Sequence, residues 1–160
     1  MYLVLDNIRS AHNVGTLFRV CDALGANEIK ICLCGFTPGP RDKYDLELKK
    51  LTKVSLGSEK TVKFERFETT LGCLQSLKEK NVDLFCLELT DTAKDYFNIK
   101  NFDWKNSALV LGNEVEGVSL DVLDMVKDHI YIPMNGAKES LNVSVAASVV
   151  LFHLKNVFLH

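Results

Sequence analysis

Short apolar segments typical of strands alternate with segments of helical periodicity along this 160-residue chain, and this alternation restricts the possible folds more than any other feature. The predicted strands cover residues 2–6, 28–34, 61–67, 83–89, 107–113 and 129–133. The predicted helices cover residues 13–25, 46–57, 68–81 and 119–127, and a long terminal helix begins at residue 141. This order predicts one α/β layered domain with a largely parallel sheet.

Residues that commonly end or begin helices support these boundaries. Gly25 follows the last apolar residue of the first helix and is expected to stop it. A threonine at the start of residues 68–81 and Ser119 are expected to cap the amino ends of two later helices.

Composition excludes several classes of protein. No apolar run is long enough to span a bilayer, and residues 1–10 lack the basic start and cleavage site of a signal peptide. We therefore expect a cytoplasmic protein without a membrane partner.

The five cysteines are odd in number and form no CxxC pair, so we interpret them as buried apolar residues in a reducing compartment. The four histidines show no ligand spacing, which predicts no metal site.

The net charge of -2 gives no overall support for nucleic-acid binding. Residues 41–66, however, contain eight Lys or Arg and five Asp or Glu, so basic charge is concentrated there. Such a local surface can bind phosphate, but charge alone favours a solvated face of mixed charge.

In parallel sheets, ligands bind outside the carboxyl ends of the strands, so the loops that begin at Asp6, Leu89, Gly112 and Ile132 are the candidates. The loop LGNEVEG (residues 111–117) matches neither a P-loop nor a dinucleotide fingerprint. Its two glutamates would repel a pyrophosphate. One interpretation is that this loop binds a neutral or cationic ligand. The other is that the loop is a plain turn between a strand and a helix.

Arg19 lies among apolar residues of the first predicted helix, so its charged group needs a partner. One interpretation is a salt bridge to Asp22, three residues further along the helix. The other is a clamp for a phosphate or an oxyanion.

Three segments together resemble a known family. The sequences HNVGTLFRVCD (residues 12–22), LGNEVEG (111–117) and IPMNGAKESLNVSVAA (132–147) are similar, in order, to the three signature motifs of the SpoU or TrmH-like RNA ribose 2′-O-methyltransferases. This family belongs to the SPOUT superfamily of S-adenosylmethionine enzymes. The resemblance implies a SPOUT-type fold with a C-terminal deep trefoil knot, and an obligate homodimer with the active site near the subunit interface. The terminal helix is apolar on nearly all sides, which independently favours burial by both the core and a partner.

The resemblance also implies the site residues. Five polar residues are the expected catalytic group: Arg19, Asn13, Glu114, Ser140 and Asn142. Seven residues are expected to form the slot for the methyl donor S-adenosylmethionine, the last of them as a weaker candidate: Leu111, Gly112, Gly117, Ile132, Met134, Leu141 and Leu89.

In this family the motif-one arginine activates the 2′-hydroxyl. Because arginine is effectively always protonated, we expect Arg19 to grip a phosphate and stabilise the developing alkoxide instead. Three acceptors then remain open for the hydroxyl proton: a phosphate oxygen, water or Glu114. We expect Glu114 and Asn142 to position Arg19 or the ribose.

Many relatives carry an N-terminal substrate-binding domain, whereas we expect residues 1–160 to be a single catalytic domain without one. The RNA, either tRNA or rRNA, would then contact a basic group in the 41–53 region: Arg41, Lys43, Lys49, Lys50 and Lys53. The alternative is a knotted RNA-binding or assembly factor that does not methylate. A dehydrogenase is disfavoured, because no glycine fingerprint follows the first strand.

Overall fold

The computed structural model describes residues 1–40 and 45–159 and contains one sheet of seven strands in the order β3-β2-β1-β6-β4-β7-β5. All of its strand pairs are parallel. The strands are β1 (Tyr2–Asp6), β2 (Lys30–Cys34), β3 (Phe64–Phe67), β4 (Asp83–Leu87), β5 (Lys94–Asp95), β6 (Ser107–Leu111) and β7 (Asp128–Tyr131). The predicted α/β class with a parallel sheet is confirmed.

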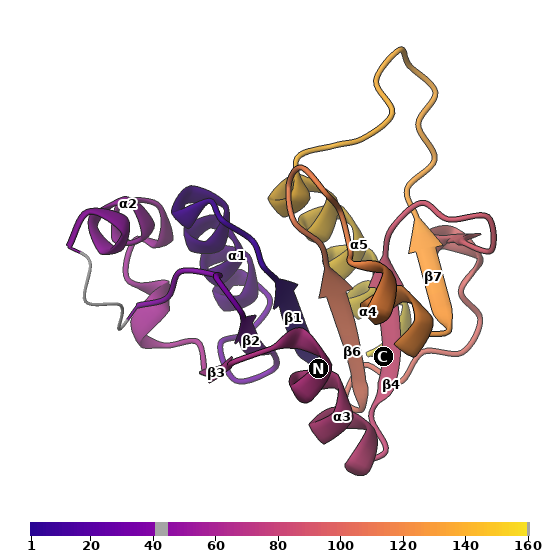
Figure 1. Ribbon diagram of the computed structural model, residues 1–160, viewed down its shortest axis with the longest axis horizontal. Coiled ribbons are helices and arrows are strands. Elements are labelled where there is room, and N and C mark those ends of the chain that lie inside the picture. The colour runs from indigo at the N-terminus through magenta and orange to yellow at the C-terminus, as the bar shows by residue number, and fades with distance from the viewer. Residues whose placement is uncertain (41–44, 160) are drawn as a thin grey trace.

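Helices cover both faces of the sheet (Figure 1). They are α1 (Ala11–Ala23), α2 (Asp45–Ser55), α3 (Thr70–Glu79), α4 (Leu120–Met125) and α5 (Val143–Phe158), with two 3-10 turns, η1 (Ser58–Lys60) and η2 (Tyr96–Asn98). The apolar faces of α1 and α5 share one core with one side of the sheet. Those of α3 and α4 share a second core with the other side.

Strand alternation divides side chains between these two cores. In β1, Leu3 and Leu5 point into the core below α1 and α5, whereas Val4 points into the core below α3 and α4. All three are fully buried. A strand covered on both faces is expected to be continuously apolar, and this explains the apolar runs in the sequence.

Most of the predicted helix ends are confirmed. Gly25 has a φ of 111° just after α1, and the Thr69 side chain accepts a hydrogen bond from the Gly72 N–H at the start of α3. Ser119 does precede α4, but its side chain makes no capping bond. Its N–H instead donates to the Asp6 carboxylate at 3.4 Å.

The polar segment after β4 was given neither a strand nor a helix in the sequence analysis. It contains β5 and η2, and β5 pairs in parallel with β7. A strand of two residues is too short to show the alternation that identifies strands in a sequence.

The five cysteines are all buried and unpaired. Burial raises the pKa of the Cys21 and Cys86 thiols, so they are held protonated and unreactive. Among the helices of residues 1–40 and 45–159, none has the length and apolar character needed to cross a membrane.

Candidate active site

Asn13 is the point where the three family-like segments meet. Its side chain lies in the first turn of α1 and is only 6% exposed. The Asn13 amide nitrogen donates to Glu114 Oε1 at 2.9 Å, and its amide oxygen accepts from Asn142 Nδ2 at 3.1 Å. One polar side chain from each segment therefore takes part in a single hydrogen-bonded chain.

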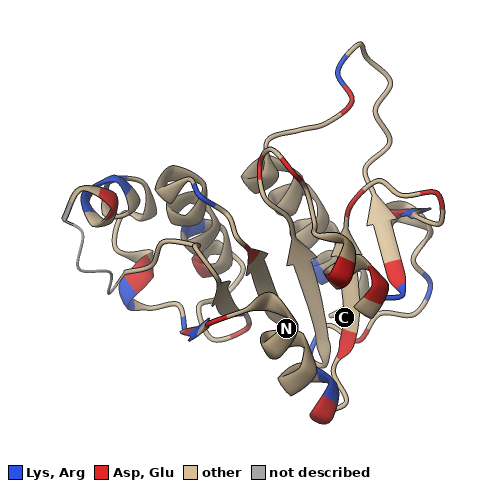
Figure 2. Ribbon diagram, in the orientation of Figure 1, with Lys and Arg blue, Asp and Glu red and all other residues tan. Residues whose placement is uncertain are grey.

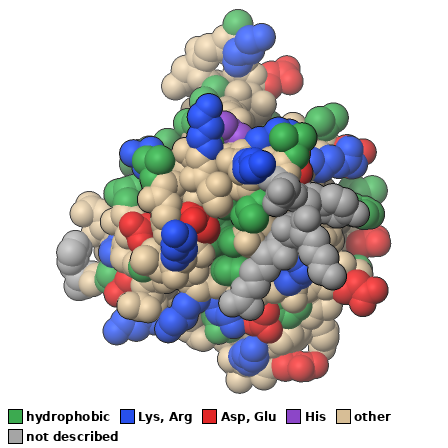
Figure 3. All heavy atoms as spheres, turned by 90° about the vertical axis from the view of Figure 1, so that its left-hand side faces the viewer, with side chains coloured by type: hydrophobic (Ala, Val, Ile, Leu, Met, Phe, Trp, Pro, Cys, Tyr) green, Lys and Arg blue, Asp and Glu red, His purple; other side chains and the backbone are tan. Residues whose placement is uncertain are grey.

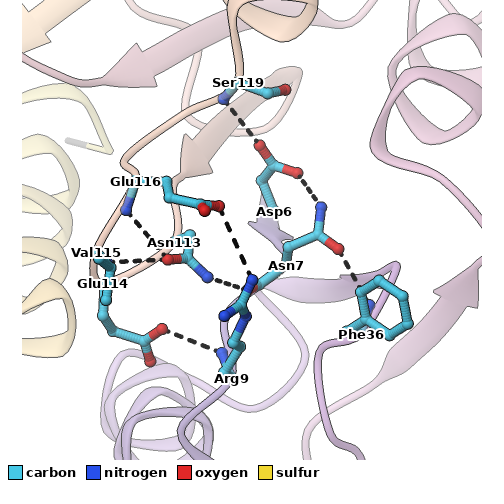
Figure 4. Close-up of polar contacts among 9 residues, drawn as sticks. All are labelled: Asp6, Asn7, Arg9, Phe36, Asn113, Glu114, Val115, Glu116 and Ser119. Carbon is cyan, nitrogen blue, oxygen red and sulfur yellow. Dashed lines mark hydrogen bonds and ion pairs between the residues drawn. The ribbon is translucent and has the colours of Figure 1, made fainter.

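Glu114 binds the amino end of α1 through both of its carboxylate oxygens. Besides Asn13, Oε1 accepts from the Ser10 N–H at 3.1 Å. Oε2 accepts from the Arg9 N–H, also at 3.1 Å (Figure 4). These N–H groups precede the first turn of the helix and have no partner within it. Neither Arg9 nor Ser10 was predicted, because backbone donors have no signature in a sequence.

The same contacts set the charge state of Glu114. Partial burial alone would raise the pKa of this carboxyl. The hydrogen bonds from Asn13, Arg9 and Ser10 outweigh burial, and the net effect is a pKa below the ordinary value of 4.5. Glu114 is therefore ionised at neutral pH and is a weak proton acceptor.

Asn142 caps α5 while it binds Asn13. Its Oδ1 accepts from the Ser144 N–H at 2.9 Å, from the Ser144 hydroxyl at 2.7 Å and from the Val145 N–H at 3.4 Å. Its amide nitrogen remains for Asn13. The third family-like segment is thus attached to the first at the point where α5 begins.

Arg19 and Ser140 are not brought into this cluster. Arg19 is exposed, six residues along α1 from Asn13, and has no polar partner in the described part of the chain. The salt bridge to Asp22 is wrong, because the Asp22 carboxylate accepts from the Thr61 hydroxyl at 2.6 Å and forms no ion pair with Arg19. Ser140 is exposed and makes no hydrogen bond to the described residues.

The loop after β6 is fixed by Asn113, which is 7% exposed. Its Oδ1 accepts from the N–H groups of Val115 and Glu116, and its amide nitrogen donates to the Asn7 carbonyl at 2.8 Å (Figure 4). Asn113 and Gly117 also exchange two backbone hydrogen bonds of 2.9 Å. The loop is therefore a closed turn attached to the end of β1.

Glu88, at the end of β4, connects two of the loops expected to hold the methyl donor. Its carboxylate accepts from the N–H of Leu89 and from the N–H of Val118, each at 3.0 Å. Sequence reasoning missed this residue, because a lone glutamate after a strand has no distinguishing pattern.

The residues predicted to bind the methyl donor follow β6, β4 and β7, which are neighbours in the sheet. Leu111 and Gly112 are buried, Gly117, Ile132 and Met134 are half-buried, and Leu89 and Leu141 are 65% and 40% exposed. The segment between β7 and α5 extends away from the rest of the domain (Figure 1). The strand-end residues therefore gather at one edge, while residues 133–142 reach into solvent, apart from the half-buried Met134.

Three of the five predicted RNA-binding residues can be placed. Lys49, Lys50 and Lys53 are exposed on α2, and Lys50 pairs with Glu47 at 2.7 Å. On this side of the molecule, Figure 2 shows basic and acidic positions mixed along the ribbon, and Figure 3 shows basic side chains interspersed with acidic ones. Arg41 and Lys43 lie outside the described residues.

Comparison with known proteins supports the family resemblance. The model of the SpoU rRNA Methylase family matches residues 1–152. The chain belongs to this family. The match includes all three segments that meet at Asn13.

Curated relatives of this SpoU family member are named as RNA methyltransferases. A tRNA (guanosine(18)-2′-O)-methyltransferase of Aquifex aeolicus is 31% identical over 151 residues, which are 92% of this chain and 64% of the relative. The corresponding enzyme of Escherichia coli is 26% identical over 92% of this chain and 59% of its own length. The chain therefore spans about three fifths of these relatives.

Solved structures share the fold. An rRNA methyltransferase from Sinorhizobium meliloti with bound AdoMet superimposes with a TM-score of 0.82 at 26% identity, over 97% of this chain and 55% of that one. The TrmH/SpoU tRNA modifying enzyme of A. aeolicus gives 0.79 at 27% identity, over 97% and 73%.

Gly112 is required because the loop after β6 folds back against it. A Cβ on Gly112 would lie 2.3 Å from the backbone of both Gly117 and Val118. We expect Gly112→Ala to lower the free energy of unfolding by on the order of 3 kcal/mol, because backbone atoms cannot move aside easily. Gly136→Ala is the matched control, since a Cβ there meets nothing within 4 Å. Equal urea midpoints for the two variants would contradict this account.

Glu114 is expected to make stability depend on pH. Since its pKa is lowered on folding, the unfolded chain takes up the proton first as the pH falls. The contribution of Glu114 is therefore present above about pH 4.5 and is lost as the pH falls through the folded-state pKa. Glu114→Gln should cost about 1 kcal/mol at pH 7 and flatten the acid limb of the stability curve.

The control for this experiment is Glu116→Gln. Glu116 forms only an exposed ion pair with Arg9 at 3.9 Å, which should contribute little. Urea unfolding from pH 3 to 7 measures both variants. A Glu116→Gln curve that changes as much as the Glu114→Gln curve would rule out the specific role of Glu114.

Two substitutions of Asn142 separate its capping role from its bond to Asn13. Asn142→Ala removes both and should cost about 1 to 2 kcal/mol. Asn142→Asp keeps an oxygen that accepts the hydrogen bonds of the α5 cap. It replaces the amide nitrogen with a second oxygen, so the hydrogen bond to Asn13 is lost. Far-ultraviolet circular dichroism should show that the aspartate variant keeps its helix content. Urea unfolding should show that it loses less stability than the alanine variant. If alanine and aspartate are equally destabilising, the cap is not the main contribution.

Proposed function

We propose that this SpoU family member transfers a methyl group from S-adenosylmethionine to a ribose 2′-hydroxyl of tRNA or rRNA. The observation that carries this proposal is the hydrogen-bonded chain Asn142–Asn13–Glu114, which joins the three family-like segments at the carboxyl ends of the strands. The names of the relatives, which are tRNA and rRNA 2′-O-methyltransferases, support the same reaction.

The strand-end edge suits S-adenosylmethionine chemically. Leu89 and Leu141 present exposed apolar side chains, and the half-buried Ile132 and Met134 add apolar surface of the kind that nucleoside pockets use. The loop beside them carries Glu114 and Glu116, which favour a cationic sulfonium over a pyrophosphate. We assign the methyl-donor site to this edge, with the backbone of Leu111, Gly112 and Gly117 as its floor. When bound, S-adenosylmethionine supplies a methyl group that is already activated for displacement.

The polar residues take different roles in this proposal. Glu114 is occupied by three donors and ionised, so it positions the amino end of α1 and does not accept the hydroxyl proton. That proton passes to a phosphate oxygen or to water. Arg19, whose planar guanidinium has no partner within the described chain, grips a phosphate of the RNA and stabilises the developing alkoxide. We assign Ser140 and Asn142, both in the third segment, to the ribose of the substrate.

We propose further that the protein is a homodimer. Val145, Val149 and Phe152 form an exposed apolar stripe along α5, each between 38% and 49% exposed. A second copy that covers this stripe would remove that apolar surface from water.

We also infer that residues 132–147 belong to a C-terminal deep trefoil knot, on the strength of their similarity to the third family motif. The five reduced cysteines suit a reducing compartment such as the cytoplasm.

RNA recognition is assigned to the basic region at α2. Lys49, Lys50 and Lys53 are exposed and can contact phosphates, although Lys50 also pairs with Glu47. Arg41 and Lys43 precede them in the sequence. Because acidic residues are interspersed, we expect these contacts to be few and salt-dependent.

Thermal unfolding with and without S-adenosylmethionine tests the proposal, with NAD as the control ligand. A ligand present at roughly a hundredfold its dissociation constant should stabilise the native state by about 2.7 kcal/mol. We expect an upward shift of Tm with S-adenosylmethionine alone, followed by methyl transfer to unmodified tRNA or rRNA transcripts. A protein that binds RNA but shows neither the shift nor transfer would be a non-catalytic RNA-binding factor, and the proposal would be abandoned.

A further inference from the structure

A hollow of the described surface lies beside the candidate active site, not in it. It has a volume of about 740 Å³ and opens at the carboxyl ends of β1, β2 and β3, between the starts of α3 and α4. We call it the β1–β3 pocket. None of the residues assigned to the methyl donor or to the catalytic group lines it. Its size falls in the range of pockets that hold small organic ligands.

The pocket is continuous with the active-site network through Asn7 (Figure 4). The Asn7 carbonyl accepts from Asn113 in the loop after β6, and its side-chain oxygen accepts from the Phe36 N–H at 3.2 Å. Asn7 adopts a left-handed φ of 53° to make both contacts. Asn7 therefore joins the loop of the candidate active site to the wall of the β1–β3 pocket.

Phe36 is presented to solvent on a turn that is held firmly. Its side chain is 86% exposed. Gly35 before it has a φ of 58°, and a Cβ there would lie 2.2 Å from Asn7 Oδ1. After it, the Thr37 hydroxyl donates to the carbonyls of Leu5 and Cys34 at 3.1 and 2.8 Å. The backbone of this turn is held in place, so the exposed Phe36 ring is presented at a defined position, as a stacking platform requires.

The rest of the lining combines apolar and acidic groups. Phe67, Leu71 and Val122 supply apolar surface, and the polar side chains include three carboxylates against one guanidinium. The Asp6 carboxylate is already bonded to Asn7, Thr70 and Ser119. Glu68 and Asp121 are exposed and have no polar partner among the described residues. Such a lining disfavours phosphate and offers acceptors to a ligand with N–H groups.

We propose that the β1–β3 pocket receives an unstacked guanine base of the RNA, stacked on Phe36 with its N–H edge toward Glu68 or Asp121. Guanine presents two adjacent N–H donors on its pairing edge, which one carboxylate can accept together, whereas uracil presents one. Sequence-specific RNA recognition commonly uses such splayed bases on aromatic side chains. The inference rests on the proposed function, since it takes RNA as the substrate.

Binding of short RNA to the full chain without S-adenosylmethionine tests this proposal separately from methylation. The probes are the labelled oligoribonucleotides UUUUGUUUU and U9, measured by fluorescence anisotropy. We expect the guanine-containing probe to bind at least about fivefold more tightly. Phe36→Ala should weaken its binding roughly 5- to 150-fold, the effect of losing one base stack. Phe36→Trp should retain it.

Matched variants make the result specific. Phe97→Ala removes another exposed phenylalanine, 63% exposed and outside the pocket lining, and should leave binding unchanged. The double variant Glu68→Ala and Asp121→Ala should bind both probes equally. Equal affinity of the wild type for both probes, no binding at all, or no effect of Phe36→Ala would overturn the proposal.

The Tm shift with S-adenosylmethionine distinguishes the two failures. Phe36→Ala should keep the shift of the wild type, because Phe36 lies outside the methyl-donor site. If the wild type lacks that shift but discriminates the probes through Phe36, the methyltransferase proposal fails and the base pocket stands. If the shift is present and the probes are not distinguished, only the base pocket fails.

Discussion

The hydrogen bond between Asn13 and Glu114 is the contact on which the strand-end edge depends. It lies between the start of α1 and the loop after β6, about a hundred residues apart in the chain. Asn13 also binds the cap of α5, and Glu114 also binds the N–H groups that precede α1. Removal of either side chain would leave partly buried donors without acceptors, which costs more than the bond itself contributes. The same hydrogen bonds of Asn13 and Glu114 therefore set the geometry of the site and attach the starts of α1 and α5 to it.

The layered fold could be predicted because its signals are local. Strand and helix patterns differ in period, and Gly25 and Thr69 end or begin helices through their own backbone and side-chain chemistry. The features that were not predicted correctly depend on partners that are distant in the sequence. Ser119 gives its N–H to Asp6 and makes no capping bond, and β5 exists only because β7 lies beside it.

The residues of the candidate site also fall into those that could be predicted from the sequence and those that could not. Asn13, Glu114 and Asn142 were predicted from the family resemblance, and the structure brings them into contact. Arg9 and Ser10 act through backbone groups, and Glu88 and Phe36 are single residues without a pattern, so none could be predicted. The Arg19–Asp22 pair had suitable helical spacing, but Thr61 from a distant segment is the actual partner of Asp22.

The pairing of β1 with β6 has a consequence for how the chain is made. Tyr2 in β1 lies opposite Ala108 in β6, so β1 must wait for a partner strand that is synthesised about a hundred residues later. On the ribosome, β1 can pair only with β2 until residues 107–111 have emerged, and its other edge stays open. Such non-local parallel pairing is slow and prone to aggregation. The nascent chain is therefore most in need of a chaperone just before β6 appears.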